Sequence, residues 1–151
     1  MPWTNRGAYL MVGIYFRNAT APANFNAALC TSATAPTVDH NTLSELTEIA
    51  AGNGYTAGGQ SVARSASGFD VYTEDDTNDR ALVQMVDMVW TASGGPIPAS
   101  GNGARYMALV DDNATAGSRQ ITGVFDLTSD RTVSDTQALT IQNAEFRAST
   151  V

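Results

Sequence analysis

A pattern of short β-strands between Arg105 and Gln142 constrains the fold of this chain more than any other feature. The stretch reads ARYMALVDDNATAGSRQITGVFDLTSDRTVSDTQALTIQ, which has the order strand, polar loop, strand, turn, strand. Alternating residues in its middle face opposite ways: Ile121, Gly123, Phe125 and Leu127 on one side, and Thr122, Val124 and Asp126 on the other. A period of two is typical of a strand with one buried face. The stretch therefore predicts a β-rich building or binding module, and it carries no catalytic grouping.

Further strand-like segments occur along the rest of the chain. Together with 105–110, 119–127 and 137–142, they lie at 24–31, 60–65, 69–72, 81–92 and 145–148. Frequent Gly, Pro, Asn and Asp residues mark turns between them. Roughly eight short strands with such turns predict an all-β fold, an antiparallel β-sandwich of jelly-roll or immunoglobulin-like type.

The run ALVQMVDMVWTA, residues 81–92, is the strongest strand signal. Leu82, Val86, Met88 and Trp90 share one face, and Val83, Met85 and Val89 share the other. A strand that is apolar on both faces is central in a sheet or has its second face covered by a partner.

One short helix and an N-terminal arm complete the predicted architecture. Thr42 to Glu45 matches a capping box, in which a hydroxyl and a carboxylate each satisfy a free backbone amide. The predicted helix runs from there to a glycine stop at Gly52. Residues 1–23 form the arm, with a strand near Tyr9 to Phe16, and residues 24–151 form a single β-sandwich domain. A chain of 151 residues suits one domain with a real core.

Charge and apolar content exclude several classes of partner. The net charge is −7, there is no lysine, and the eight arginines are spread along the chain. Phosphate contacts need a basic patch, so DNA, RNA and anionic membranes are poor partners. The longest apolar run, residues 7–16, is shorter than the ~20 residues that span a bilayer.

Catalytic and cofactor-binding residue types are scarce, so we expect neither an enzyme nor a bound cofactor. Cys30 is the only cysteine and His40 the only histidine, which is too few for an internal disulfide or a structural zinc site. Cys30 is expected to be a buried small hydrophobe. His40 follows Asp39, but no G-x-S-x-G elbow accompanies them, and a lone loop histidine is usually solvated.

Two acidic tips leave calcium binding open as an alternative to plain solvation. TEDDTNDR, from Thr73 to Arg80, carries four carboxylates, and Asp111 and Asp112 form the second tip. Hard cations prefer such oxygen-rich loops, but the spacing does not match an EF-hand. Solvated turns are the favoured interpretation.

Large apolar side chains in the arm are the candidate interface residues. They are Trp3, Tyr9, Met11, Tyr15 and Phe16. Core packing is one interpretation. The other is a docking arm, because aromatic and methionine side chains are favoured interface anchors.

Four segments together resemble a family of small tailed-phage virion proteins. They are TLSELTEIAAGNGYTAGGQSV, VDMVWTASGGPIP, ARYMALVDD and FDLTSDRTVSDTQALTIQ, which cover roughly Thr42 to Gln142. The similar elements are a GxGYxxGGQ loop, a strand that ends in Trp-Thr-Ala, an Arg-Tyr strand and a final hairpin. These are turn and strand signatures, and none of them is an active-site signature.

The resemblance implies a compact β-sandwich with a structural role. The expected function is capsid decoration: a cement protein that binds the outside of a phage head and stabilises it. The expected partners are the major capsid protein and copies of this chain, in a homo-oligomer for which a trimer is one option. The protein would be made in the bacterial cytoplasm and end in the virion. The alternative is a host-surface or glycan-binding module on a tail or fibre, with its site on loops 73–80 and 93–103.

Overall fold

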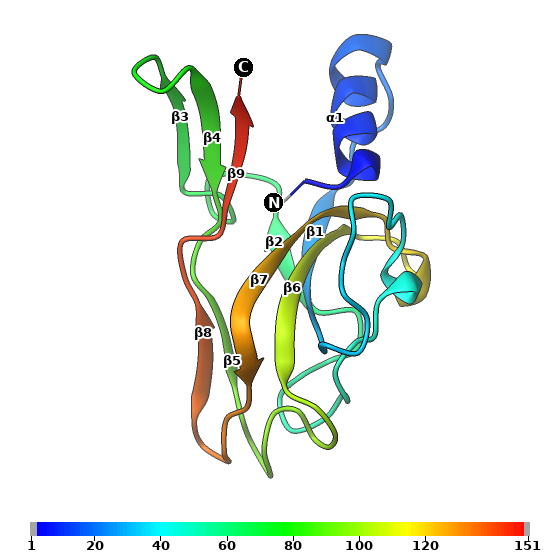
Figure 1. The fold of residues 1–151 in the computed structure, drawn as a ribbon, viewed down its shortest axis with the longest axis vertical. Coiled ribbons are helices and arrows are strands. Elements are labelled where there is room, and N and C mark those ends of the chain that lie inside the picture. Colours follow the sequence, from blue (N-terminus) through cyan, green and yellow to red (C-terminus); the bar gives the residue numbers. More distant parts are fainter. Residues whose placement is uncertain (1–2, 150–151) are drawn as a thin grey trace.

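The structure, a computed structural model, describes residues 3–149 and consists mainly of antiparallel strands (Figure 1). Within that range the elements are α1 Asn5–Arg17, β1 Asn24–Cys30, β2 Gln60–Ala63, β3 Val71–Asp75, β4 Arg80–Gln84, β5 Met88–Thr91, β6 Ala104–Asp111, β7 Ile121–Arg131, β8 Ala138–Ile141 and β9 Glu145–Ser149, with 3₁₀ turns at Leu43–Glu45 and Ala116–Ser118. The prediction of an all-β antiparallel sandwich is confirmed.

The strands form three sheets. The largest has the order β2-β1-β6-β7, a second has the order β3-β4-β9, and β5 pairs with β8. In Figure 1 the β3-β4-β9 sheet stands at the same end of the molecule as α1, while β5 and β8 run towards the opposite end. Every pairing is antiparallel.

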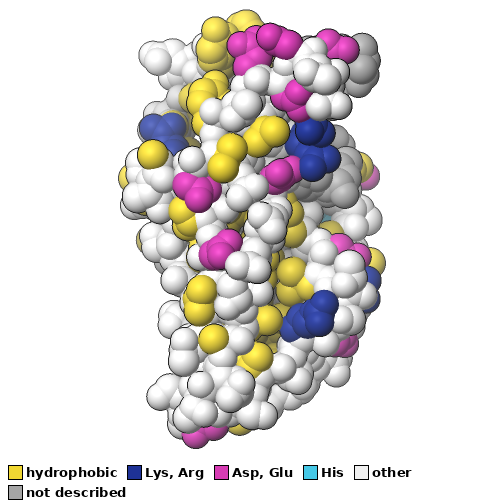
Figure 2. All heavy atoms as spheres, turned by 90° about the vertical axis from the view of Figure 1, so that its left-hand side faces the viewer, with side chains coloured by type: hydrophobic (Ala, Val, Ile, Leu, Met, Phe, Trp, Pro, Cys, Tyr) yellow, Lys and Arg dark blue, Asp and Glu magenta, His cyan; other side chains and the backbone are white. Residues whose placement is uncertain are grey.

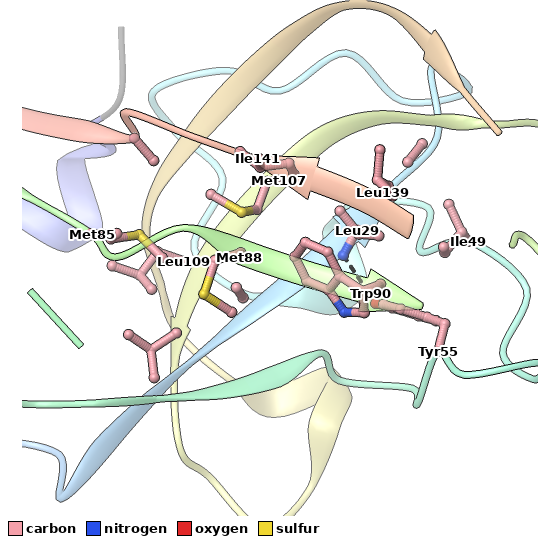
Figure 3. Packing of buried hydrophobic residues seen from close by; sticks show 14 of the residues in the cluster. Leu29, Ile49, Tyr55, Met85, Met88, Trp90, Met107, Leu109, Leu139 and Ile141 are labelled. Carbon is pink, nitrogen blue, oxygen red and sulfur yellow. Dashed lines mark hydrogen bonds between the residues drawn. The ribbon is translucent and has the colours of Figure 1, made fainter. Parts of the chain in front are cut away.

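The main hydrophobic core lies between the large sheet and the β5-β8 pair (Figure 3). Leu29 of β1 and Met107 and Leu109 of β6 are buried against Met88 and Trp90 of β5. Removing each such side chain from water contributes about 1.5–3 kcal/mol. This core joins the large sheet to the β5-β8 pair.

The large sheet is buried on its second face as well. Ala28 and Cys30 alternate with the main-core residues of β1 and pack beneath Leu43 and Leu46. The segment that carries these leucines replaces the predicted helix from Thr42, of which only the turn Leu43–Glu45 forms. The capping box and a short helix are confirmed, but the helix stops before the predicted end at Gly52, because the chain becomes extended at Leu46 and pairs with β1. Tertiary pairing overrides local propensity here.

The predicted continuous strand at 81–92 is two strands. β4 pairs with β3 and β9, whereas β5 pairs with β8, and the chain changes sheets at residues 85–87. The amide of Met85 donates to the carbonyl of Ala144 at 2.9 Å, and the Met85 side chain is fully buried. The change of sheets accounts for apolar residues on both apparent faces of the run.

β7 departs from the alternation predicted for it. The alternation predicts Val124 on the same face as Thr122 and Asp126. In the structure Val124 is buried with Ile121, in the cluster that covers the second face of the large sheet. Phe125 and Leu127 pack against the main core. A register shift between Leu109 and Val110 of β6 is the local cause, because a bulge moves side chains from one face to the other.

The arm prediction was wrong in its secondary structure. Residues 5–17 form the helix α1, in place of the predicted strand. The side chain of Thr4 caps its start, and Asn18 ends it in the left-handed conformation at φ 52°. Among the described residues, no helix has the length and apolarity needed to cross a membrane.

Candidate functional site

The first turn of α1 is fixed to the body of the protein. The hydroxyl of Thr4 donates to the carbonyl of Ile121 at 2.7 Å and accepts from the amide of Gly7 at 3.0 Å. The amide of Asn5 donates to the carbonyl of Val38 at 2.8 Å. These bonds hold the start of the helix between β7 and the loop before the 3₁₀ turn.

Gly7 lets α1 approach β7 at backbone distance. A Cβ atom at this position would lie 1.9 Å from the carbonyl oxygen of Thr122. No real Cβ contact is that short, so any other residue would push the helix away from the strand. The close approach fixes the direction in which α1 leaves the body.

Trp3 is a second anchor between the arm and the body. Unlike the exposed side chains further along the arm, it packs against the body of the protein. Its ring lies 4.6 Å from the ring of Phe146, and its indole nitrogen donates to the carbonyl of Arg147 at 2.8 Å. Phe146 in turn packs edge-on against Phe125. Trp3 therefore joins the helix start to both β9 and β7.

Beyond this anchored turn, α1 projects from the body with large apolar side chains in solvent (Figure 1). The exposed fractions are 68% for Tyr9, 43% for Met11, 50% for Val12, 83% for Tyr15 and 72% for Phe16. No charged or amide side chain occurs from Gly7 to Phe16. A helix that is hydrophobic all round normally belongs in a buried environment. We call this exposed set of five side chains the α1 surface.

Four of the five predicted interface residues belong to the α1 surface: Tyr9, Met11, Tyr15 and Phe16. Trp3 lies at the base of the helix and is half-buried. Val12 was missed because a strand period places it on the face opposite Tyr9, whereas a helical period places Tyr9, Val12 and Phe16 together. Reading the arm as a helix would have found it.

The charge on α1 is purely cationic. Arg6 lies over the ring of Tyr9, 5.3 Å from its centroid, and its Nε donates to Gln120 at 2.7 Å. Arg17 occupies the last turn, where a cation interacts favourably with the helix dipole. The first acidic residue of the chain is Asp39, so residues 1–38 carry two arginines and no carboxylate side chain.

The acidic tip after β3 is a tight turn with internal hydrogen bonds. Asp75 pairs with Arg80 at 2.9 Å and accepts bonds from the amide side chain of Asn78. The bonds from Asn78, followed by the bond from Arg80, lower the pKa of the Asp75 carboxyl. Within residues 3–149, no group of three or more His, Cys, Asp or Glu side chains is placed to hold a metal ion.

The two loops proposed for a glycan site do not come together. The turn after β3 lies at the end of the molecule that carries α1, whereas the loop between β5 and β6 lies at the opposite end (Figure 1). That second loop is held against its neighbours by reciprocal backbone bonds between Ile97 and Val133. A single site built from both loops is therefore ruled out by the fold.

His40 and Asp39 form no catalytic relay with each other. The Nδ1 atom of His40 accepts a bond from the backbone amide of Thr37 at 3.0 Å. The carboxylate of Asp39 accepts a bond from the side chain of Asn5 at 2.8 Å. Both residues stabilise the loop that supports the start of α1.

The GNGYTAGGQ motif has a structural role. The buried hydroxyl of Tyr55 donates to Glu48 at 2.5 Å and accepts from the amide of Leu29 at 2.9 Å. Burial, followed by the nearby Glu48 carboxylate, raises the pKa of Tyr55. At Gly59, a Cβ would lie 2.1 Å from the carbonyl oxygen of Ala27. The motif thus joins its loop closely to β1.

A shallow hollow of about 360 Å³ lies beside the base of α1. Its lining includes Trp3, Thr37, Tyr106 and Asp126. Arg105 donates two bonds to the Asp126 carboxylate, at 2.7 and 3.0 Å, and these bonds lower the pKa of that carboxyl. The hollow combines aromatic edges with an ion-paired carboxylate.

Comparisons with protein-family models, with curated proteins and with solved structures gave no match to this chain.

Proposed function

We propose that this protein is a structural subunit of a tailed-phage virion that binds the outside of the head and stabilises it. The observation that carries the proposal is the α1 surface, five large apolar side chains on a helix whose base is fixed to the body. Such a surface gains free energy when a neighbouring subunit covers it, at about 25 cal/mol per Å² of apolar area. The proposed mechanism is adhesion, with no bond making or breaking.

Linkage explains how adhesion would stabilise a shell. A subunit that binds only the assembled state favours that state by mass action. The anchoring bonds of Thr4 and Gly7 support this mechanism, because α1 is held in one direction before it meets a neighbour. A preorganised surface loses less entropy on binding than a free arm.

The location on a phage head is supported by the resemblance of residues 42–142 to small virion proteins. The net charge of −7 is compatible with a position away from packaged DNA. The expected neighbours are the major capsid protein and further copies of this chain.

The test is occupancy on purified heads of the source phage from which the protein has been removed. The variant Tyr9→Asp/Phe16→Asp places two charges on the α1 surface and leaves the anchoring residues Trp3, Thr4 and Gly7 intact. We expect at least a tenfold loss of occupancy, because a charge buried without a partner is strongly unfavourable. Deleting the whole arm would be less informative, since it would also expose β7 and Phe146.

Val89→Asp is the matched control, because Val89 is also an exposed apolar residue, 43% exposed, on β5 away from α1. The control should bind heads like the unaltered protein. Equal occupancy for both variants would remove α1 from the mechanism. Failure of the unaltered protein to bind any head would refute the proposed function.

Glycan binding is a second candidate, favoured by the hollow with Trp3, Tyr106 and Asp126. Aromatic surface beside a fixed polar group is a common composition for a small-molecule site. Retention on a glycan array that is lost in Tyr106→Ala would support it, with Tyr72→Ala as the control. No retention by the unaltered protein would exclude it.

A further inference from the structure

We propose that the neighbour that covers α1 is a second copy of this chain, which receives the helix on the β3-β4-β9 sheet. This inference rests on the proposed adhesive function and names the partner of its surface. The copies would stand side by side with parallel long axes, each α1 meeting the sheet of the next copy. A head-to-tail contact of this kind builds a ring where the rotation between copies closes and an open filament where it does not.

The receiving face of the β3-β4-β9 sheet carries exposed apolar side chains beside the carboxylate of Glu74, which is the cross-strand partner of Ala81. Tyr72, Val83 and Phe146 are direct cross-strand partners and therefore share one face. Phe146 is buried by Trp3, but Tyr72 at the outer edge is 86% exposed. Ala81 and Ala148 form the next exposed pair along the same face. We call the exposed part, Tyr72, Ala81 and Ala148, the sheet surface.

The charges of the two surfaces are complementary. α1 ends at Arg17, and the sheet ends at the β3-β4 turn, where Glu74 of β3 and Asp76 of the turn are exposed. Figure 2 shows acidic side chains gathered at this end of the molecule, with hydrophobic side chains beside them. Because α1 and the sheet project in the same direction (Figure 1), parallel copies bring the tip of one helix near the acidic turn of the next.

The charge is also divided along the sequence. Residues 1–38 hold two of the eight arginines and none of the fifteen carboxylates, so they carry +2 while residues 39–151 carry −9. A surface that binds α1 should be apolar with acidic residues at its edge. The sheet surface with the neighbouring β3-β4 turn has this composition. Complementary rims of this kind select a partner and its orientation.

Most of the exposed apolar area of the proposed contact lies on α1. Tyr9, Tyr15, Phe16 and Tyr72 are each at least 68% exposed. An aromatic side chain buries roughly 150–250 Å² when it is fully covered. The sheet surface supplies one such side chain, Tyr72, whereas α1 supplies the other three together with Met11 and Val12. The sheet side therefore lies well below the roughly 800 Å² per partner of a standard interface, and the expected self-association is of the weak class.

The experiment measures the mass of the whole protein in solution by sedimentation equilibrium, for the unaltered chain and for Phe16→Asp, Tyr72→Asp and Val89→Asp. We expect an oligomer for the unaltered protein and for Val89→Asp, and monomers for the other two variants. Far-UV circular dichroism and urea midpoints confirm that each variant is folded. A monomeric unaltered protein, or oligomers in all variants, would overturn the inference.

Mixing the two monomeric variants tests whether one surface meets the other. In a mixture, the intact helix of Tyr72→Asp can still bind the intact sheet of Phe16→Asp, so a heterodimer should form. A contact of helix with helix or of sheet with sheet would not be rescued by mixing. The absence of a heterodimer would therefore reject the proposed pairing.

Charge reversal tests the orientation of the contact. Arg17→Glu alone, or Glu74→Arg/Asp76→Arg alone, should weaken self-association about twofold to fivefold, and the combination should restore most of it. Weakening without restoration would reject the placement of Arg17 beside the acidic turn.

Head binding separates the two proposals. A chain that self-associates through these surfaces but does not occupy heads would retain this inference and refute the proposed function. A monomer whose head occupancy falls in Phe16→Asp would retain the function and assign α1 to the capsid protein instead. Capture of the monomer by lipid vesicles would assign α1 to a membrane surface and overturn the inference.

Discussion

Gly7 sets the distance between α1 and β7, and its substitution gives the first test of the anchored helix. Gly7→Val places atoms where the carbonyl of Thr122 lies, at 1.9 Å from the ideal Cβ. We expect a loss of about 1–3 kcal/mol in the free energy of unfolding, the usual effect of overpacking. Urea unfolding followed by tryptophan fluorescence measures it, because Trp3 lies at the same base.

Gly13 provides the control for Gly7. A Cβ at Gly13 would meet only the side chain of Ala19, at 3.6 Å, which is an ordinary contact. Gly13→Ala should raise stability or leave it unchanged, by up to about 1 kcal/mol, because glycine is a poor residue in a helix interior. Equal effects at both glycines would contradict the packing of α1 against β7.

Cys30 gives a prediction at alkaline pH. Burial, followed by the nearby Glu48 carboxylate, raises the pKa of the thiol from 9.0 to about 12. The folded protein therefore keeps the proton that the unfolded chain releases above pH 9, and stability falls as pH rises from about 9 towards 12. The slope from this group is about 1.4 kcal/mol per pH unit.

The measurement for Cys30 is the free energy of unfolding between pH 9 and 10, where Cys30→Ala should show a flatter decline. The thiol should also react with a disulfide reagent at pH 8 only after urea is added. Rapid labelling of the folded protein would show that the second face of the large sheet is open.

At the scale of elements, the chain passes from one sheet to another between β4 and β5. We expect the Met85 side chain at this bend to contribute strongly to the free energy of unfolding. Met85 is fully buried at this bend, and its amide is bonded to Ala144. Met85→Ala should cost about 2–5 kcal/mol in urea unfolding through lost packing and a residual cavity. Val89→Ala, on the exposed side of β5, should change stability by about 0.5 kcal/mol or less. Comparable losses would mean that the bend is not part of the core.

The sequence predicted most strands because their alternation and turn residues act locally. β1, β2, β6 and β8 lie within one or two residues of their predicted ranges, and Cys30 is buried as expected. The break at residues 85–87 was not predictable, because both halves of 81–92 satisfy the same local pattern. Only the positions of β3, β8 and β9 show that the run pairs with two different sheets.

The candidate site was predicted by residue type and missed in its geometry. The sequence predicts Tyr9, Met11, Tyr15 and Phe16 as interface residues from their apolar character in the arm, and all four side chains are exposed on α1; their role in an interface stays a prediction. The strand prediction for the arm was wrong because two features favour the helix: the cap from Thr4 and the close approach of Gly7 to β7. The approach of Gly7 is a tertiary contact, which a local sequence pattern does not contain. Trp3 was grouped with the others by its aromatic character, although its partners come from β9.

At the scale of the whole molecule, exposed hydrophobic surface and acidic charge meet at one end. The main core and the second cluster consist of buried residues of this one chain. The α1 surface and the sheet surface are outside both clusters. Adhesion can therefore be removed by surface substitutions while the sandwich remains folded, which makes the proposed function separable from stability.

The bond between the Trp3 indole and the Arg147 carbonyl has a practical consequence for labelling. It fixes residue 3 to β9, at the end of the molecule from which α1 projects. A reporter fused at either terminus would stand at the same end of the molecule as that helix. Gly101 lies in the loop at the opposite pole, with nothing within 4 Å of an added Cβ. An epitope inserted there would point away from the end that carries α1 and leave it unobstructed.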